Sequence, residues 1–363
     1  MGRQLAVILF LDEPGGFPSF YDEGEPTAVL QGAWGFDPAN PTALSASNVN
    51  DPGMDAPTTT ELILGVEHAF LPEFVVGANY TIRNTTDVGE FQELFRDANG
   101  NVRTISRSEY VSDGFTTGTL PDGSSYSYET FAANSSLAFT GGTLFTNGPR
   151  EINYQGLSVN ATKRLANKWM LRGYFNYNLQ EEWDIPESTF ENDDPNRFQD
   201  GAGASTQQST IDGGLYVVQS TGSGKTDNWI QSTWQANLNG LYQVAPDRPW
   251  GFNVAANVTA REGYPIPYFV PVTGSDGIGR NILATPEIDS FRNDDIFLVD
   301  LRLDKEFATA GNTSLTFSLD AFNITDETYV LQRFDNLLSG SAEHLRETVS
   351  PRVYRLGVRL NWR

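Results

Sequence analysis

Residues 155–180, QGLSVNATKRLANKWMLRGYFNYNLQ, hold two stretches in which apolar and polar side chains alternate. From Trp169 to Leu179 every second residue is apolar or glycine, and the intervening residues include Arg172 and Asn176. This period of two is typical of a β-strand. Residues 157–162 alternate in the same way, and a short turn around residues 166–168 joins the two stretches. The segment therefore predicts a β-hairpin with one apolar and one polar face. Such a hairpin fits a soluble sheet or a barrel whose apolar face meets lipid.

The same hairpin pattern recurs along the chain, and the repetition favours the barrel. Alternating segments occupy residues 62–82, 234–258 and 297–319, and a last strand ends at Trp362. Between them, residues 84–150, 181–228, 262–293 and 325–350 are polar and aperiodic, so we expect long loops. Residues 4–11 read as a further strand rather than a signal peptide, and residues 12–60 as a long loop. Short turns thus alternate with long loops over about ten strands, as in bacterial outer-membrane barrels.

This spacing predicts an all-β fold, an antiparallel transmembrane β-barrel with short periplasmic turns and long extracellular loops. No run of about 18 apolar residues occurs, so we expect no transmembrane helix. The 363 residues include no cysteine, which excludes disulfides and cysteine-bound metals, and the net charge of −22 argues against nucleic acid as a partner.

The two faces of the predicted strands suggest two sets of functional residues. Aromatic residues that open a strand after a short turn, or end the last strand, are expected to form an interfacial girdle; these are Phe74, Trp169, Trp250 and Trp362. Polar residues on the opposite face are candidates for lining a water-filled lumen and contacting a plug; these are Asn79, Arg83, Arg172, Asn176, Asn237, Asn257, Arg261, Asp300, Arg302, Asp320, Arg355 and Arg359.

Three segments near the end of the chain carry a family resemblance. Residues 299–307 (VDLRLDKEF), 319–326 (LDAFNITD) and 350–360 (SPRVYRLGVRL) resemble the last strands of TonB-dependent outer-membrane receptors. Residues 60–67, 80–83, 163–165 and 261–265 are similar to the Oar-like branch of that family. The resemblance covers most of residues 60–363.

The resemblance implies energised uptake or passage of a large, unidentified substrate across the bacterial outer membrane. It also implies a plug domain, TonB, the barrel-assembly machinery and outer-membrane lipid as partners. The family's barrel has 22 strands, which 363 residues would supply at about 16 residues each, too few for these loops. We therefore expect a C-terminal barrel section over residues 61–363, a first strand and long loop over residues 1–60, and no plug. One departure is Arg363, which follows Trp362 where the family usually ends on an aromatic residue.

No catalytic constellation is evident, so the sequence predicts no enzyme, no metal and no cofactor. His68 and His344 are far apart, and residues 222–225 lack the first glycine of a phosphate-binding loop. Asp193 and Asp194 do not have EF-hand spacing and are interpreted as a solvated acidic loop.

Two alternatives stay open. One is a stand-alone closed barrel, a pore or adhesin, in which residues 4–11 pair with residues 352–362. The other is a secreted soluble β-protein with carbohydrate-binding loops, which requires the apolar rows to be buried between sheets.

Overall fold

The computed structural model describes residues 10–11, 28–29, 48–184, 194–199, 206–207, 214–220, 228–309 and 313–362. Its contacts separate into two units, residues 1–54, 91–105 and 136–146 in the first and residues 55–90, 106–135 and 147–363 in the second. Of the predicted strand at residues 4–11, residues 4–9 fall outside the described ranges, as do Asp193 and Arg363.

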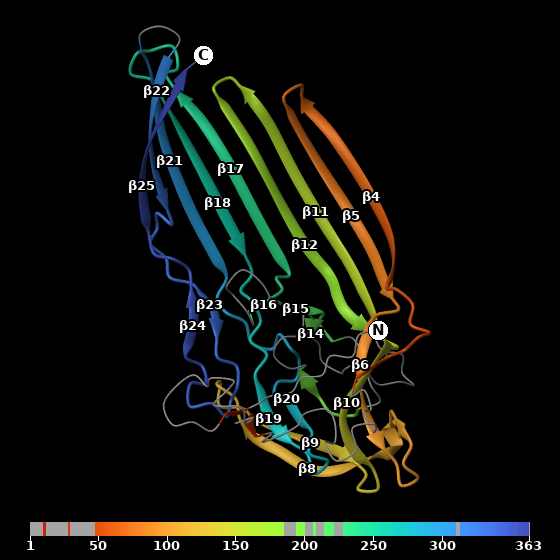
Figure 1. Ribbon diagram of the computed structural model, residues 1–363. Helices are drawn as coiled ribbons and strands as arrows, with labels where there is room; N and C mark the ends of the chain where they lie inside the picture. Colours follow the sequence, from red (N-terminus) through yellow and green to blue (C-terminus); the bar gives the residue numbers. More distant parts are fainter. Residues whose placement is uncertain are drawn as a thin grey trace. The chain divides into compact units, whose positions relative to one another are not determined.

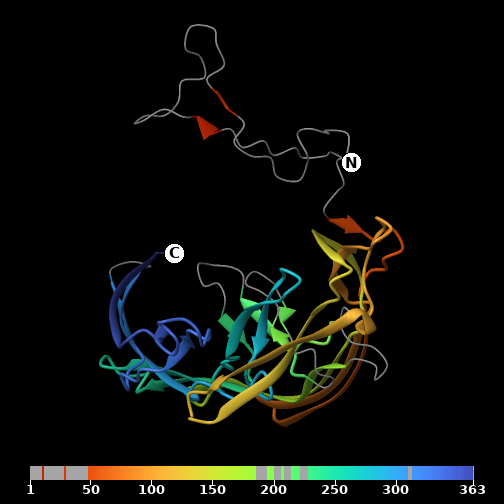
Figure 2. The same cartoon turned by 90° about the horizontal axis from the view of Figure 1, so that it is seen from below.

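The second unit is built on one nine-stranded antiparallel sheet (Figure 1). Its strands follow the order β25-β22-β21-β18-β17-β12-β11-β5-β4. Their bounds are β4 (Thr58–Leu71), β5 (Phe74–Thr86), β11 (Glu151–Ala166), β12 (Trp169–Asp184), β17 (Trp234–Val244), β18 (Phe252–Arg261), β21 (Ile296–Ala308), β22 (Thr313–Phe322) and β25 (Val353–Trp362). Each predicted hairpin is present, and the nine strands follow an open arc (Figure 2). The short turns lie together at one end of the sheet (Figure 1).

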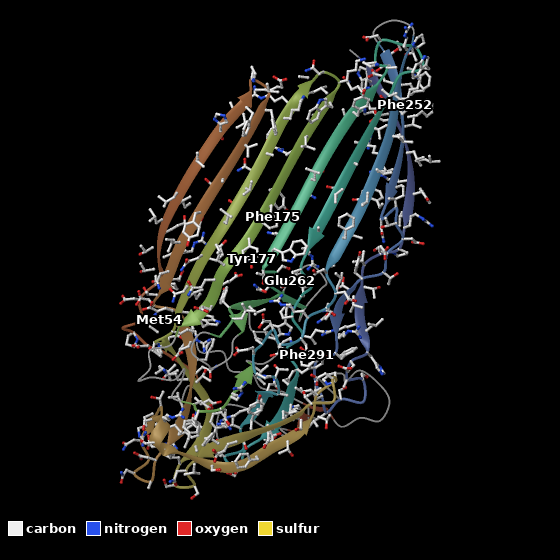
Figure 3. All side chains as sticks on the ribbon, turned by 180° about the vertical axis from the view of Figure 1, so that it is seen from behind. Met54, Phe175, Tyr177, Phe252, Glu262 and Phe291 are labelled. Carbon is white, nitrogen blue, oxygen red and sulfur yellow. The ribbon has the colours of Figure 1, made fainter. Side chains whose placement is uncertain are left out.

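In the register of this sheet, apolar residues of one strand lie opposite apolar residues of the next strand. Phe175 lies opposite Val159 on β11 and Ala236 on β17. Residues directly opposite each other in an antiparallel pair point to the same face. The apolar rows of the individual strands therefore merge into one continuous face. Phe175 and Tyr177 of β12, both labelled in Figure 3, belong to it.

The apolar face is exposed, in contrast to the core of an ordinary soluble sheet. Leu356 is 82% exposed, Val66 69% and Leu238 44%, and Trp169, Phe175, Tyr242, Phe297 and Leu319 are exposed too. The soluble alternative required these rows to be buried between two sheets, and in the described part of the chain they are not. Isolated exposed apolar residues are common, but a patch across nine strands marks a contact with lipid or protein.

The lysines of this face that the structure describes, Lys163 and Lys305, lie where their ammonium groups reach the turns. Lys163 is 3% exposed, and its Nζ donates to the carbonyl oxygens of Ala166 (2.9 Å) and Trp169 (3.0 Å). Lys305 Nζ likewise donates to the carbonyl of Gly251 at 2.7 Å. Each ammonium group donates hydrogen bonds to carbonyl oxygens near a turn, so it does not lie among the apolar side chains of this face.

The segments that we predicted as long loops connect the hairpins of the sheet, but they are not irregular as expected, since they contain strands of their own. Within the second unit they include β8 (Tyr110–Thr119), β9 (Ser125–Ala133), β13 (Phe198–Gln199), β14 (Thr206–Gln207), β15 (Val217–Ser220), β16 (Asn228–Ile230), β19 (Phe269–Thr273), β20 (Gly279–Leu283), β23 (Val330–Arg333), β24 (Leu345–Thr348) and the 3-10 turn η1 (Arg107–Glu109). They pack at the end of the sheet opposite the short turns (Figure 1). We call this group the loop assembly.

The loop assembly has its own hydrophobic core. The buried residues of this core are Leu120, Tyr126, Ile266, Tyr268, Val270 and Ala284. Phe291, labelled in Figure 3, packs against them. Since β8 and β9 belong to one predicted loop and β19 and β20 to another, neither loop could build this core alone.

The first unit is a separate, smaller structure. Its four-stranded sheet has the order β3 (Val49–Asn50), β10 (Ala138–Asn147), β6 (Gly89–Arg96) and β7 (Val102–Arg103). The rings of Phe91 and Phe145 lie 4.6 Å apart on it. Strand β1 (Phe10–Leu11) pairs with β2 (Ala28–Val29). Pairing of residues 4–11 with 352–362, which the stand-alone closed barrel needs, is therefore not found among the described residues.

Candidate functional site

The predicted lumen residues share one face of the nine-stranded sheet, although they come from seven of its strands. Asn176 lies opposite Ser158 and Gln235, and Ser158 in turn lies opposite Asn79. The same pairing links Arg172, Asn239, Asn257 and Asp300 across four strands. By period two and register, the other candidates lie on this face as well: Arg83, Asn237, Arg261, Arg302, Asp320, Arg355 and Arg359. We call it the polar face.

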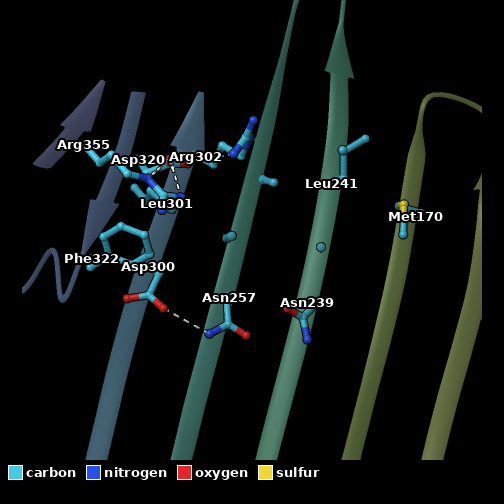
Figure 4. A pocket seen from close by; sticks show the side chains of 13 residues that line it. Met170, Asn239, Leu241, Asn257, Asp300, Leu301, Arg302, Asp320, Phe322 and Arg355 are labelled. Carbon is cyan, nitrogen blue, oxygen red and sulfur yellow. Dashed lines mark hydrogen bonds and ion pairs between the residues drawn. The ribbon is translucent and has the colours of Figure 1, made fainter. Parts of the chain in front are cut away.

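A pocket of about 400 Å³ opens on the polar face (Figure 4). Predicted residues that line it are Asn257, Asp300, Arg302, Asp320 and Arg355. Asn257 Nδ2 donates to Asp300 Oδ2 at 3.2 Å, and Asn237 Nδ2 donates to Asn257 Oδ1 at 2.9 Å. These amides and the carboxylate form a hydrogen-bonded row across β17, β18 and β21 on the polar face.

Asp320 is the centre of the charge network at this pocket. It is 5% exposed, and its two oxygens accept from Arg302 Nη1 (3.1 Å) and Arg355 Nη2 (2.9 Å). The guanidinium of Arg355 also lies 5.1 Å from the ring centre of Phe322. Arg302 and Arg355 are 41% and 63% exposed, so solvent screens each pair and reduces its strength. The network joins β21, β22 and β25 and keeps cationic groups at the surface of the pocket.

Sequence reasoning missed several residues of this site. Met170, Asn239 and Phe322 line the pocket and were not among the candidates. Asn239 lies two residues after Asn237 in the same predicted strand and therefore on the same face, so it could have been included among the candidates. Met170 and Phe322 follow the same alternation, two residues from Arg172 and Asp320, but their apolar side chains gave no reason to choose them as lumen residues.

The four predicted girdle residues lie at the short-turn end of the sheet. Phe74 and Trp169 are the first residues of β5 and β12, and Trp362 is the last residue of β25. Trp250 does not open a strand as predicted, because β18 begins at Phe252 and Trp250 lies in the preceding turn, 61% exposed. Arg248, Pro249 and Gly251 belong to the same turn, which lengthens this connection.

A buried ion cluster joins distant segments of the loop assembly. Arg280 Nε lies 3.1 Å from Asp194 Oδ2, and Arg280 Nη2 lies 3.0 Å from Asp276 Oδ2. Asp194 Oδ1 accepts from the backbone N–H of Asn196, whose side-chain amide oxygen accepts from the N–H of Phe131. Asp194 was interpreted as part of a solvated acidic loop, and this interpretation is wrong for Asp194, which is 3% exposed. Within the described ranges, no group of three or more His, Cys, Asp or Glu side chains is arranged to hold a metal ion.

The pKa of Asp276 is expected to make the loop assembly sensitive to acid. Burial alone would raise this pKa, but hydrogen bonds from Arg280 and from the backbone N–H groups of Ala133 and Ile278 lower it below the ordinary 3.8. Because the folded pKa lies below the unfolded one, Asp276 contributes stability above pH 3.8 that is lost as the pH falls through the folded pKa. We expect the urea midpoint of the loop assembly to drop between about pH 5 and about pH 3.

The Asp276→Asn variant checks the origin of that drop. Its amide does not titrate, so the variant should be less stable at about pH 5 but should lose less between that pH and about pH 3. An equal drop in both proteins would assign the acid sensitivity to other carboxylates.

Comparison with known proteins gave structural matches alone. No family model matches the chain, and no curated protein matches it. The outer membrane transporter YddB from Escherichia coli matches with 13% identity over 86% of this chain and 34% of its own, at a TM-score of 0.44. BauA, the ferric preacinetobactin receptor from Acinetobacter baumannii, matches with 13% identity over 83% of this chain and 29% of its own, at a TM-score of 0.41. The chain thus spans about a third of the length of these solved structures.

Among the described residues, no helix has the length and apolar character needed to cross a bilayer.

Proposed function

We propose that this chain is part of a β-barrel transporter in the bacterial outer membrane, of the TonB-dependent receptor class and its Oar-like branch. The observation that carries the proposal is the exposed apolar face, with Val66, Leu238 and Leu356 between 44% and 82% exposed. Water is a poor solvent for such a face, whereas acyl chains fit it. The opposite, polar face then lines an aqueous passage.

The strand lengths support a membrane-spanning role. Strands β11 and β12 have 16 residues each, and β4 has 14. About 9–11 residues suffice to cross the hydrocarbon layer when a strand is tilted. The excess length carries the strands beyond the bilayer to the loop assembly, which would serve as the external binding surface.

The edges of the sheet support a larger barrel. In the described part of the second unit, β4 pairs with β5 alone and β25 with β22 alone. Each unpaired backbone group at a lipid-exposed edge costs several kcal/mol, so β4 and β25 need further strands beside them. We therefore propose that the chain is one section of a larger barrel. The resemblance of its last strands to TonB-dependent receptors favours the C-terminal section of a 22-stranded barrel. The same proposal includes energised uptake of an unidentified substrate. It also includes a plug domain, TonB and the barrel-assembly machinery as partners.

Phase separation in a detergent that clouds on warming tests the membrane assignment. We expect the folded chain to enter the detergent-rich phase, since its apolar face binds micelles. A soluble β-protein of the same length should stay in the aqueous phase and serves as the control. Recovery of the folded chain from the aqueous phase would contradict the proposal.

A further inference from the structure

A second, smaller pocket on the polar face collects positive charge near the short-turn end of the sheet. Its volume is about 220 Å³, and its charged lining consists of Arg302, Arg355, Arg359 and Asp320. Three cations and one carboxylate therefore line the pocket, and a second carboxylate outside it, Asp304, lies 3.4 Å from Arg302 Nε. Asp320 is already bound by Arg302 and Arg355, and each guanidinium has five N–H donors, more than one carboxylate can accept.

Arg359 has no partner that would neutralise it in the described part of the chain. It is exposed on β25, directly opposite Thr316 of β22, and takes part in no ion pair or hydrogen bond there. Glu306 faces Thr316 from the other neighbouring strand, β21, but does not line the pocket.

Thr316 supplies the observation that points to a ligand. Its side chain is 5% exposed and lines the pocket, yet its Oγ1 makes no hydrogen bond within the described residues. A buried hydroxyl without a partner is costly and rare in native proteins. Ser318, the next residue of β22 on this face, adds a second hydroxyl to the lining, opposite Gly357. Gly357 has no side chain, so the Ser318 hydroxyl fits beside it; a Cβ at residue 357 would lie 2.5 Å from Ser318 Oγ.

We infer that this pocket binds a small oxyanion, either a free ion or an oxyanionic group of a larger solute. Guanidinium groups and hydroxyls are the donors that recognise phosphate, sulfate and carboxylate oxygens. Arg359 provides the uncompensated charge, Thr316 Oγ1 donates the buried hydrogen bond, and Arg302 and Arg355 contribute their remaining N–H groups. The volume holds one such anion with several waters, at about 30 Å³ per water. The site does not depend on the transport role proposed above.

Equilibrium dialysis of radiolabelled inorganic phosphate against the full chain in a maltoside detergent tests the site. Such a detergent carries no phosphate of its own. We expect saturable binding of one phosphate per chain. Arg359→Gln should weaken it about tenfold, since a hydrogen bond to a charged group is lost. Thr316→Val, which has nearly the same shape, should weaken it about threefold and should not lower the thermal midpoint without phosphate. Far-UV circular dichroism checks the β content of every variant.

Arg172→Gln is the matched control. Arg172 is exposed on the same polar face but lies outside the pocket, so the variant makes the same change of charge elsewhere. Its phosphate affinity should equal that of the unmodified chain. The inference is overturned if binding is not saturable, if Arg172→Gln weakens it as much as Arg359→Gln, or if Thr316→Val leaves it unchanged. Competition by sulfate and acetate then ranks the oxyanions.

Discussion

Replacing Leu238 with arginine is expected to prevent stable insertion of the chain into membranes. Leu238 is 44% exposed on the apolar face, lies near the middle of the 11-residue strand β17, and pairs with Gly173 and Val258. An arginine on the lipid face of a barrel strand costs about 2–4 kcal/mol at the bilayer centre. That cost lowers the equilibrium for the inserted state about 30-fold or more. Urea titration in lipid vesicles, or the fraction recovered with the outer membrane, measures it.

The adjacent residue provides the control for this variant. Asn239 lies on the polar face and lines the larger pocket, so Asn239→Arg makes a substitution to the same residue at the same depth on the opposite side. We expect a change within about 0.5 kcal/mol, as for an exposed position. If both variants insert equally well, the apolar face is not in contact with lipid and the membrane assignment is wrong.

Arg280→Met is expected to unfold the loop assembly while the nine-stranded sheet remains. The side chains of Arg280, Asp194 and Asp276 are 6%, 5% and 1% exposed. Removing the arginine leaves two carboxylates buried without their cation, and breaking such a buried pair costs about 3–5 kcal/mol. That is a large part of the total stability of a domain. Limited proteolysis at neutral pH should cut residues 106–135 and 262–293 much faster in the variant.

Arg352→Met is the comparison for this effect. Arg352 and Asp326 form a longer ion pair of 3.4 Å, with side chains 37% and 48% exposed. An exposed pair contributes about 0–1 kcal/mol, so proteolysis should change little. Equal rates for the two variants would mean that the Arg280 cluster does not hold the loop assembly.

Much of the sheet follows from the sequence. The alternation between Trp169 and Leu179 predicted a strand, and its partner across the short turn is β11, as expected. The twelve polar candidates share one face because each was chosen by the same local rule of alternation. Trp250 shows the limit of this rule, since an aromatic residue after a proline gives no measure of how many residues the turn requires.

The loop assembly could not be predicted, because its contacts join distant parts of the chain. Arg280 binds Asp194, 86 residues away, and the N–H of Ala133 donates to Asp276, 143 residues away. Short strands such as β19 and β20 have too few residues to show a period. Their hydrogen bonds are satisfied only once the other loops are in place.

The sequence by itself determined which residues form the strands of the nine-stranded sheet and which side of each of these strands is apolar, because side chains along an extended backbone alternate in direction. The tertiary structure decided which hairpins are neighbours, at what register they pair, and where pockets open. It placed Thr316 opposite Arg359 and brought Arg302 and Arg355 to Asp320. Those placements depend on hydrogen bonds between strands far apart in the chain, and no local pattern encodes the energy of pairing one register over another.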